Sequence, residues 1–474
     1  MNSDKLSKLA EFISAHAGDD PDRLALQKDR WPEIDVASAV STLVSRKKLA
    51  GKTPLWACTE GLVLPRTLSA EQCSGEAAAR HKAALLSRLW KFFLSRSCEK
   101  EGYGASERKP RIADLTGGLG VDSLEFSKVA DAVLYNDMNP ALAEAAAHNF
   151  MVLGAENIEV CSYMADIESL SPESEAVDGK AGVLARELLE FRPDVIFLDP
   201  ARRDGCGKKV FLLEDCSPDI LKLRDRLLEI APLLMVKLSP MADISMVIER
   251  LGCACTEVQV VESQGECKEL LAVLCRRDVS YAEGIDTQNN ASIGECICSI
   301  VNLDCASYEG NTVFRFRRSE EADCMGLRFV CEDAIVPGTL IFEPGKALMK
   351  AGCFKLLGNV LGAAAFGRDT HYYILDGAYG IRPEKGAEDV CRTLPEVSRA
   401  GKIFRIDDVA VMSGKSIKEF GRRHPEAEVT ARGVRMTSED VRKRLGCRPS
   451  DRYHIFALHA DKTDKNYMLF CERV

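Results

Sequence analysis

Seven apolar runs alternate with helix-like patterns between residues 110 and 277, and this alternation constrains the fold more than any other feature. The runs are Arg111–Leu115, Ala132–Asn136, Ile158–Ser162, Val195–Leu198, Leu233–Leu238, Thr256–Val261 and Leu270–Leu274. Strands that alternate with helices are typical of a parallel sheet with helices on both faces. The sequence therefore predicts a doubly wound α/β domain over residues 104–277.

The segment before this domain, residues 1–103, has a helical pattern. A second helix is predicted over Ala70–Ser95, with Ser69 as its N-cap and Gln72 as the capping-box partner. The first helix is indicated by apolar residues at helical spacing, namely Leu6, Leu9, Phe12 and Ile13. We therefore expect an N-terminal helical cap.

The segments after residue 277 contain shorter strand-like runs. Residues 278–340 are predicted to form a small α+β, ferredoxin-like module, and residues 341–474 a further C-terminal region. The runs are Cys296–Val301, Val313–Arg317, Leu327–Val330, Ile403–Ile406 and Tyr453–Leu458. At 474 residues the chain is long enough for this division into several domains.

Charge and cysteine content exclude some classes of protein. The net charge of −9 gives no general affinity for nucleic acid, so any such contact requires a local basic patch. The nineteen cysteines are scattered without C-x-x-C pairs, which favours reduced thiols and no metal site. No signal-like segment and no run of 18 apolar residues occurs, so we expect a cytoplasmic protein that does not span a membrane.

The turn after the first strand has a composition suited to binding a nucleotide-like ligand. It reads Asp114-Leu115-Thr116-Gly117-Gly118-Leu119-Gly120, and glycine there lets the backbone approach a ligand closely. Asp137 ends the next strand about 20 residues later, where a carboxylate binds ribose hydroxyls. Ser123 stands where a dinucleotide-binding motif has its third glycine, which disfavours a nicotinamide-dependent oxidoreductase.

This turn resembles the cofactor motif of class I methyltransferases, which bind S-adenosylmethionine (SAM). The resemblance implies that Asp114 faces the methionine end of SAM and that Asp166, just after the third strand, contacts the adenine. A solvated loop residue is the alternative for Asp166. The residues expected to bind SAM are Asp114, Thr116, Gly118, Gly120, Asp137, Asp166 and Asp199.

The segment after the fourth strand is the candidate catalytic edge, because ligands of open α/β sheets bind at the carboxyl ends of strands. It reads Asp199-Pro200-Ala201-Arg202-Arg203-Asp204. Asp199 is expected to orient or deprotonate the acceptor, and Arg202 and Arg203 to hold phosphate or a base edge. Salt bridges from the arginines to nearby carboxylates are the alternative.

This hexapeptide resembles the fourth motif of nucleic-acid methyltransferases, with departures. Ala201 and Arg202 stand where enzymes that methylate exocyclic amines have proline and an aromatic residue. The uracil-C5 methyltransferases carry a nucleophilic cysteine after the fifth strand, but the matching segment here is Lys237-Leu238-Ser239-Pro240. Amine methylation is therefore in doubt, and covalent C5 chemistry is disfavoured.

Several segments together resemble bacterial class I methyltransferases that carry a C-terminal THUMP-like domain. The matching segments are Leu68–Ser74, Ala79–Lys82, Asp114–Asp122, Leu198–Arg203, Phe342–Pro344 and Thr430–Arg435. The resemblance implies a Rossmann-like, seven-stranded sheet, with the THUMP-like part in residues 341–474. The segment before the first strand also resembles that of RNA cap guanine-N2 methyltransferases, which implies that Glu71, Gln72 and Ser74 line the SAM pocket.

THUMP domains bind RNA, so the resemblance makes RNA the expected partner. Residues 414–452 carry eleven Lys and Arg against six Asp and Glu, a net charge of +5 that suits phosphate binding. A solvated charged face is the alternative. The leading hypothesis is direct transfer of the SAM methyl group to a base nitrogen in tRNA or rRNA. A protein or small-molecule acceptor, or a non-catalytic RNA-binding protein with a vestigial SAM pocket, are the alternatives.

Overall fold

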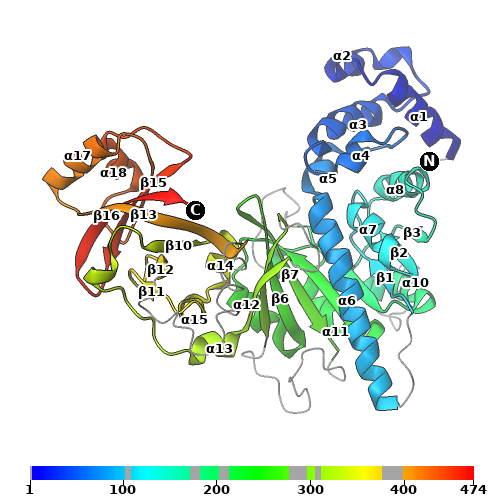
Figure 1. The fold of residues 1–474 in the computed structure, drawn as a ribbon. Coiled ribbons are helices and arrows are strands. Elements are labelled where there is room, and N and C mark those ends of the chain that lie inside the picture. Colours follow the sequence, from blue (N-terminus) through cyan, green and yellow to red (C-terminus); the bar gives the residue numbers. More distant parts are fainter. Residues whose placement is uncertain are drawn as a thin grey trace. The chain divides into compact units, whose positions relative to one another are not determined.

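The computed structural model describes residues 3–101, 108–170, 182–201, 213–276, 296–304, 311–375 and 399–474 (Figure 1). The chain forms two compact units. The first consists of Met1–Val258 and Glu269–Cys296, and the second of Gln259–Lys268 and Ile297–Val474. Neither unit is one continuous stretch of sequence, because the chain crosses from one unit to the other after Val258, after Lys268 and after Cys296.

Helices form the N-terminal part of the first unit, as predicted. They are α1 (Ser3–Ala15), α2 (Pro21–Leu26), α3 (Val36–Leu49), α4 (Pro54–Cys58), α5 (Thr67–Gln72) and α6 (Glu76–Glu101). Leu6, Leu9 and Ile13 of α1 are buried in one cluster with residues of α2 and α3. The helical spacing of these apolar residues thus marks the buried face.

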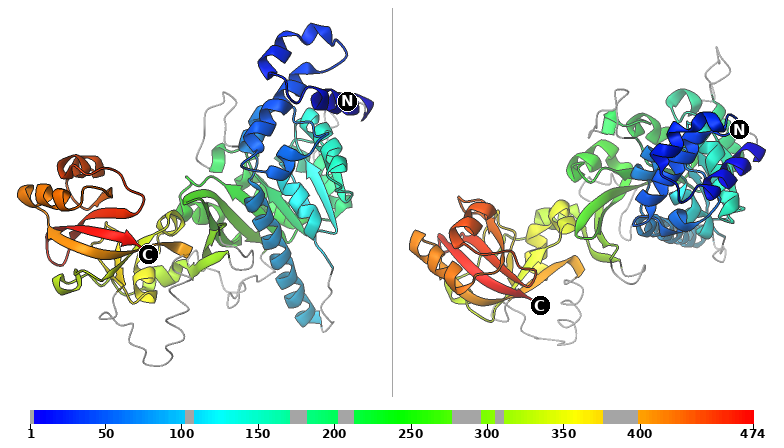
Figure 2. Two further views of the ribbon diagram at one scale, coloured as in Figure 1. Left: turned by 45° about the horizontal axis from the view of Figure 1, so that its top comes forward. Right: turned by 90° about the horizontal axis from the view of Figure 1, so that it is seen from above.

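The helix predicted over Ala70–Ser95 is wrong, because the chain forms two helices there. Ser69 lies inside α5, whose N-cap is Arg66, and the long α6 begins only at Glu76. The break is held by other parts of the fold: the backbone N–H of Glu76 donates to the carbonyl of Lys52 at 2.9 Å. In both figures α6 runs as one long helix, and it packs against α7 (Val121–Val129) (Figures 1 and 2).

The sheet of the first unit has the strand order β3-β2-β1-β4-β5-β7-β6. Strands β1 to β5 are parallel to their neighbours, and β7 is antiparallel to β5. The strands are β1 (Arg111–Asp114), β2 (Ala132–Asn136), β3 (Ile158–Cys161), β4 (Val195–Leu198), β5 (Leu233–Leu238), β6 (Cys255–Ser263) and β7 (Glu266–Cys275). The seven predicted strands are thus present, and β4 and β5 are buried throughout.

Helices connect the parallel strands. They are α8 (Pro140–Val152), α9 (Ile167–Leu170), α10 (Val183–Phe191), α11 (Ile220–Ile230) and α12 (Ile244–Leu251). Asn139, Asp219 and Asp243 cap the N-termini of α8, α11 and α12, each accepting a backbone N–H from the first turn. Because the strands are parallel, the carboxyl ends of β1, β2, β4 and β5 meet at one edge of the sheet.

The second unit contains a hairpin and a larger sheet. The hairpin joins β8 (Ile297–Asn302) to β9 (Thr312–Arg317). The sheet has the order β11-β12-β10-β13-β16-β15-β14. Its strands are β10 (Leu340–Pro344), β11 (Ala364–Ala365), β12 (Tyr373–Leu375), β13 (Gly401–Val411), β14 (Glu428–Arg432), β15 (Tyr453–Ala460) and β16 (Lys465–Arg473). The strand predicted over Leu327–Val330 is wrong: only a bridge from Phe329 to Ala365 forms, because β11 is too short to extend it.

Short helices complete this unit, with α13 (Arg318–Asp323), α14 (Lys346–Ala351) and α15 (Phe354–Val360) before the long strands. Helices α17 (Gly414–Arg423) and α18 (Ser438–Leu445) lie on one side of β14–β16 (Figure 2). Their apolar residues share a buried cluster with those strands. Ser413 and Thr437 are the N-caps of these two helices, and each takes part in a capping box.

Candidate active site

The glycine-rich turn connects β1 to α7 and adopts a backbone that side chains would disturb. Gly118 and Gly120 have φ values of 55° and 91°, in the left-handed region that favours glycine. A Cβ atom on Gly117 would lie 2.1 Å from the Tyr135 ring, so a side chain cannot be accommodated there without a shift. The Tyr135 hydroxyl donates to the Gly118 carbonyl at 2.6 Å. The turn therefore packs directly against Tyr135 of β2.

Asp114 ends β1 and is buried beneath this turn. Its carboxylate accepts hydrogen bonds from the Ser123 hydroxyl at 2.6 Å and from the Thr116 backbone at 3.2 Å. Burial raises the pKa of Asp114 to about 7, although the Ser123 hydrogen bond opposes the shift. Ser123, which replaces a third glycine in the sequence, thus holds the first-strand acid in place.

Asp137 follows β2 and closes the turn from the other side. Its two carboxylate oxygens accept from the backbone N–H groups of Gly118, at 2.9 Å, and Asn139, at 2.8 Å. Burial raises the pKa of Asp137, whereas these backbone hydrogen bonds lower it. These hydrogen bonds connect the glycine-rich turn to the end of β2, and the binding of ribose hydroxyls by Asp137 stays a prediction.

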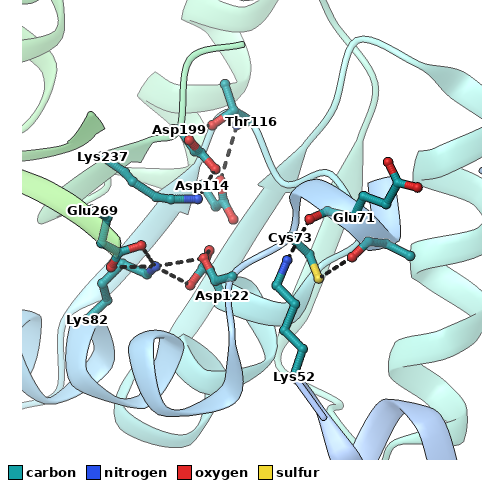
Figure 3. Close-up of polar contacts among 12 residues, drawn as sticks. Lys52, Glu71, Cys73, Lys82, Asp114, Thr116, Asp122, Asp199, Lys237 and Glu269 are labelled. Atoms are coloured by element: carbon teal, nitrogen blue, oxygen red, sulfur yellow. Dashed lines mark hydrogen bonds and ion pairs between the residues drawn. The ribbon is translucent and has the colours of Figure 1, made fainter. Parts of the chain in front are cut away.

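Asp199 follows β4 and pairs with a lysine from the neighbouring strand (Figure 3). The Lys237 ammonium donates to Asp199 Oδ2 at 2.5 Å, and the Asp199 backbone N–H donates to the Thr116 hydroxyl at 2.6 Å. The Lys237 side chain is 8% exposed and that of Asp199 is 27% exposed. In this ion pair the side chain that carries the carboxylate is therefore more accessible to solvent than the one that carries the ammonium.

A fully buried lysine lies beside this pair. Lys82, from α6, has its ammonium 3.1 Å from Asp122 Oδ1 and 3.2 Å from Glu269 Oε1. It also donates to the Ser74 hydroxyl at 2.8 Å, and that hydroxyl donates to Asp122 Oδ2 at 2.7 Å. We call Ser74, Lys82, Asp122 and Glu269 the buried ion cluster. It joins the N-terminal helices to the turn of α7 and to β7.

A lysine and a thiol from two other segments lie near the ion pair: Lys52 is between α3 and α4, and Cys73 is between α5 and α6 (Figure 3). Lys52 donates to the carbonyl of Glu71 at 2.7 Å, and the Glu71 carboxylate pairs with Lys48. Burial lowers the pKa of Lys52 and raises the pKa of the Cys73 thiol beside it. Among the residues predicted to line a pocket here, Gln72 is exposed and Ser74 belongs to the buried ion cluster.

The other predicted site residues have separate positions. Asp166 accepts the Ser169 backbone N–H at 2.7 Å and so caps the short helix α9, which is compatible with the loop alternative. Arg202 and Arg203 lie outside the described residues. The remaining predicted residues, Asp114, Thr116, Gly118, Gly120, Asp137 and Asp199, gather at the carboxyl edge of the sheet.

Sequence reasoning missed the functional potential of two lysines. Lys237 is the one charged residue of the apolar run Leu233–Leu238, and a charge inside a buried strand is the signal that marks it. Lys82 lies in a matching segment of the family resemblance, but its partner Glu269 is 187 residues away. No local pattern connects residues so far apart.

The described ranges bear on two kinds of feature, namely clusters of metal-ligating residues and helices able to cross a membrane. These ranges contain no group of three or more His, Cys, Asp or Glu residues placed to hold a metal ion. None of the described helices is long and apolar enough to cross a membrane.

The basic residues of the C-terminal region are only partly free to bind phosphate. Four of the eleven form ion pairs: Arg423 with Asp408, Lys443 with Glu439, Arg448 with Glu426 and Arg452 with Glu472. On α17, three others are exposed at positions that share one face of the helix, namely Lys415, Lys418 and Arg422. We call these three residues the α17 basic stripe.

Comparison with known proteins supports this architecture. Residues 401–473 match a family model described as THUMP domain-like, and residues 341–378 match one described as a ferredoxin-like domain. The second match begins after the 278–340 segment for which a ferredoxin-like module was expected. No curated protein matches the sequence.

Among solved structures, a proposed methyltransferase from Porphyromonas gingivalis W83 is similar over 100% of this chain and 99% of its own, with 22% identity and a TM-score of 0.75. The fold is that of a class I methyltransferase. Weaker similarity extends to a predicted O-methyltransferase, Atu636 from Agrobacterium tumefaciens (17% identity, 39% of this chain, 79% of that chain, TM-score 0.26). It extends also to an rRNA methylase from Streptococcus thermophilus (12% identity, 35% of this chain, 87% of that chain, TM-score 0.24). The match over the whole chain confirms the class I methyltransferase fold expected from the sequence. The family-model match over residues 401–473 confirms the THUMP-like resemblance of the C-terminal region.

Proposed function

We propose that this protein is a SAM-dependent methyltransferase that acts on tRNA or rRNA. The observation that carries the proposal is the set of carboxylates at the carboxyl edge of the sheet. Asp114, Asp137 and Asp199 follow three parallel strands and are joined by hydrogen bonds through the glycine-rich turn. Open α/β sheets bind their ligands at this edge. In a class I methyltransferase fold, SAM is the ligand that such an edge is expected to hold.

The chemistry of these residues fits SAM. Its ribose hydroxyls are hydrogen-bond donors, and each oxygen of Asp137 has a second lone pair beyond the one used by a backbone N–H. Its methionine end carries an ammonium group, for which the carboxylate of Asp114 is a suitable partner. The glycine turn offers close approach of backbone, and Asp166 stays the predicted contact of the adenine.

SAM supplies an electrophilic methyl group, so the protein has mainly to position the acceptor. Asp199 borders this position and is the candidate for orienting the acceptor. Arg202 and Arg203 stay the predicted phosphate contacts. The sequence predicts a base of tRNA or rRNA as the acceptor, reached by direct transfer, and the segment after β5 offers no cysteine for a covalent route.

Two features support RNA as the substrate class. The C-terminal residues match the THUMP domain-like model, and the α17 basic stripe provides cations without ion-pair partners among the described residues. Exposed lysines and arginines on one face are suited to a phosphate backbone. tRNA and rRNA are found in the cytoplasm, which agrees with the predicted location.

The proposal is tested by comparing RNA from cells with and without the gene. Mass spectrometry of the nucleosides should reveal one methylated nucleoside that disappears with the gene and returns with the wild-type copy. A purified protein that binds SAM but methylates only protein or small-molecule fractions would contradict the RNA assignment. A protein that binds RNA but no SAM would instead indicate a non-catalytic role.

Replacing Asp137 with alanine is expected to weaken SAM binding about tenfold or more. The variant removes a charged hydrogen-bond acceptor, and tenfold corresponds to about 1.4 kcal/mol. Isothermal titration calorimetry measures the affinity directly. Asp131→Ala is the matched control, because Asp131 is an exposed carboxylate just before the first residue of the same strand β2. Equal affinities for the two variants would contradict the ribose assignment.

Removing two charges from the α17 basic stripe is expected to weaken RNA binding and leave SAM binding unchanged. The double variant Lys418→Ala with Arg422→Ala should also reduce the salt dependence of RNA affinity, by about one unit of slope for each phosphate that is no longer neutralised. Binding is measured by fluorescence anisotropy at several salt concentrations. Lys5→Ala with Lys8→Ala on α1 removes the same charge from another exposed helix and should have little effect.

A further inference from the structure

The positive charge of Lys237, beside Asp199, indicates which kind of atom is methylated. Lys237 is the residue of β5 that contacts Asp199, and its ammonium is 2.5 Å from the carboxylate. Burial lowers the pKa of Lys237, but the negative charges of Asp199, Glu269 and Asp122 outweigh this effect and raise it overall. Lys237 is therefore a fixed cation and hydrogen-bond donor at this edge, and not a base.

The sheet register explains why Lys237 faces the buried ion cluster. Lys237 lies opposite Leu271 of the antiparallel strand β7. Side chains two residues apart on a strand share a face, so Glu269 is on the same face as Lys237. Glu269 is itself held by Lys82, which also contacts Asp122 (Figure 3). Lys237 is thus held by its contact with Asp199 and is stabilised as a cation by the charges of Glu269 and Asp122.

A fixed ammonium suits an oxygen acceptor better than a nitrogen acceptor. A neutral ring nitrogen that attacks the methyl group becomes positively charged, and a neighbouring cation raises the energy of that transition state. A hydroxyl oxygen must lose its proton, and negative charge develops on it during attack. An ammonium that donates to this oxygen stabilises the developing charge, and a carboxylate beside it can take the proton.

We infer that the methyl acceptor is the ribose 2′-hydroxyl of RNA, with Lys237 and Asp199 as catalytic residues. The hydroxyl oxygen bonds to the methyl carbon while Lys237 donates a hydrogen bond to it. The bond between that carbon and the sulfonium sulfur breaks, and its electron pair stays on sulfur. The hydroxyl proton passes to Asp199 and then to water. This inference rests on the proposed function and replaces the base nitrogen as the acceptor.

The open side of Asp199 is consistent with this role. Its Oδ2 is engaged by Lys237, whereas no residue in the described part of the chain donates to Oδ1. Because the side chain is partly exposed, Oδ1 can face the acceptor hydroxyl. This acceptor also explains why Ala201 and Arg202 replace the proline and the aromatic residue of the amine-methylating motif. A ribose hydroxyl can be methylated without an aromatic side chain that stacks on a flipped base.

The position of the methyl group can be read from alkaline hydrolysis. Total RNA from cells that lack the gene is incubated with the full-length protein and SAM carrying a radioactive methyl group, and then hydrolysed in alkali. Alkali cleaves RNA through the free 2′-hydroxyl, so a 2′-O-methyl group leaves a resistant dinucleotide. We expect the label in dinucleotides. Label in mononucleotides would overturn the inference but keep the proposed RNA substrate, and no label in RNA would overturn both.

A second experiment tests Lys237 by ligand binding as well as by the rate of methyl transfer. Binding to the protein saturated with S-adenosylhomocysteine is compared for random-sequence RNA and DNA oligonucleotides of equal length. Lys237→Met should reduce the preference for RNA at least fivefold, with SAM affinity within threefold of the wild type, while the rate of methyl transfer falls about 100-fold or more. An unchanged preference for RNA, or a SAM affinity that falls as far as the rate, would overturn the role of Lys237. Lys222→Met, on the exposed face of α11, is the control and should match the wild type.

Discussion

Lys82→Met is expected to lower the free energy of unfolding of the first unit by about 3–5 kcal/mol. The variant removes the cation of the buried ion cluster and leaves the carboxylates of Asp122 and Glu269 without their ion-pair partner. Breaking a buried ion pair by removing one partner has this cost, because the remaining charge stays desolvated. The Lys82 side chain has no solvent exposure at all, and Glu269 is only 4% exposed, so water cannot take over the role of the ammonium.

Tryptophan fluorescence during urea unfolding measures this effect selectively. The three tryptophans, Trp31, Trp56 and Trp90, all belong to the first unit. Lys222→Met is again a suitable control, because Lys222 pairs with Asp219 while its own side chain is 72% exposed. An exposed pair contributes only about 0–1 kcal/mol. Similar decreases in the two variants would contradict the structural role assigned to the buried ion cluster.

Asp199→Asn is expected to slow methyl transfer by a factor of about 100 to 10,000. The amide keeps the size of the side chain and can still accept a hydrogen bond from Lys237, but it cannot take a proton from the acceptor. General-base catalysis by a positioned side chain contributes a factor of this order. Single-turnover kinetics with SAM in excess measure the chemical step, and calorimetry should give a SAM affinity within threefold of the wild type. Asp199 would then be catalytic rather than a cofactor ligand.

Asp194→Asn is the matched control for this measurement. Asp194 precedes β4, whereas Asp199 follows it, so the two carboxylates lie at opposite ends of the same strand. Asp194 pairs with Arg108 at 2.6 Å, away from the carboxyl edge. Its variant should be somewhat less stable but keep the wild-type rate. An Asp199→Asn variant with normal rate and weak SAM binding would reverse the assignment and make Asp199 a cofactor ligand.

The parallel core of the fold could be predicted because its strands are buried and therefore appear in the sequence as continuous apolar runs. The bounds of β2, β4 and β5 agree with the sequence prediction to the residue, and the glycine turn lies at the end of β1 as expected. The contact of Gly118 with Asp137 was also foreseeable, since both follow strands that are neighbours in the sheet. Periodicity and motif spacing report such local features well.

The features that sequence reasoning missed depend on contacts between distant segments. The break between α5 and α6 is set by Lys52 and by the Ser74–Asp122 hydrogen bond, whereas the local sequence reads as one capped helix. The catalytic edge was defined around Asp199 and two arginines, but its lysine partner comes from a neighbouring strand 38 residues later. The single charge in an apolar strand marks Lys237 in the sequence, but no pattern in the linear sequence identifies Asp199 as its partner.

The discontinuous boundary between the two units limits how the protein can be divided. The chain passes from one unit to the other after Val258, after Lys268 and after Cys296. No single cut therefore yields two intact pieces, and a fragment that ends at residue 277 would carry ten residues whose packing partners are missing. Removing residues 401–473 would take β13 to β16 from a sheet that also contains β10 to β12 and expose a hydrogen-bonding edge on β10. Exchange of the THUMP-like part between genes would for the same reason require matched insertion points, which favours inheritance of the two units as one piece.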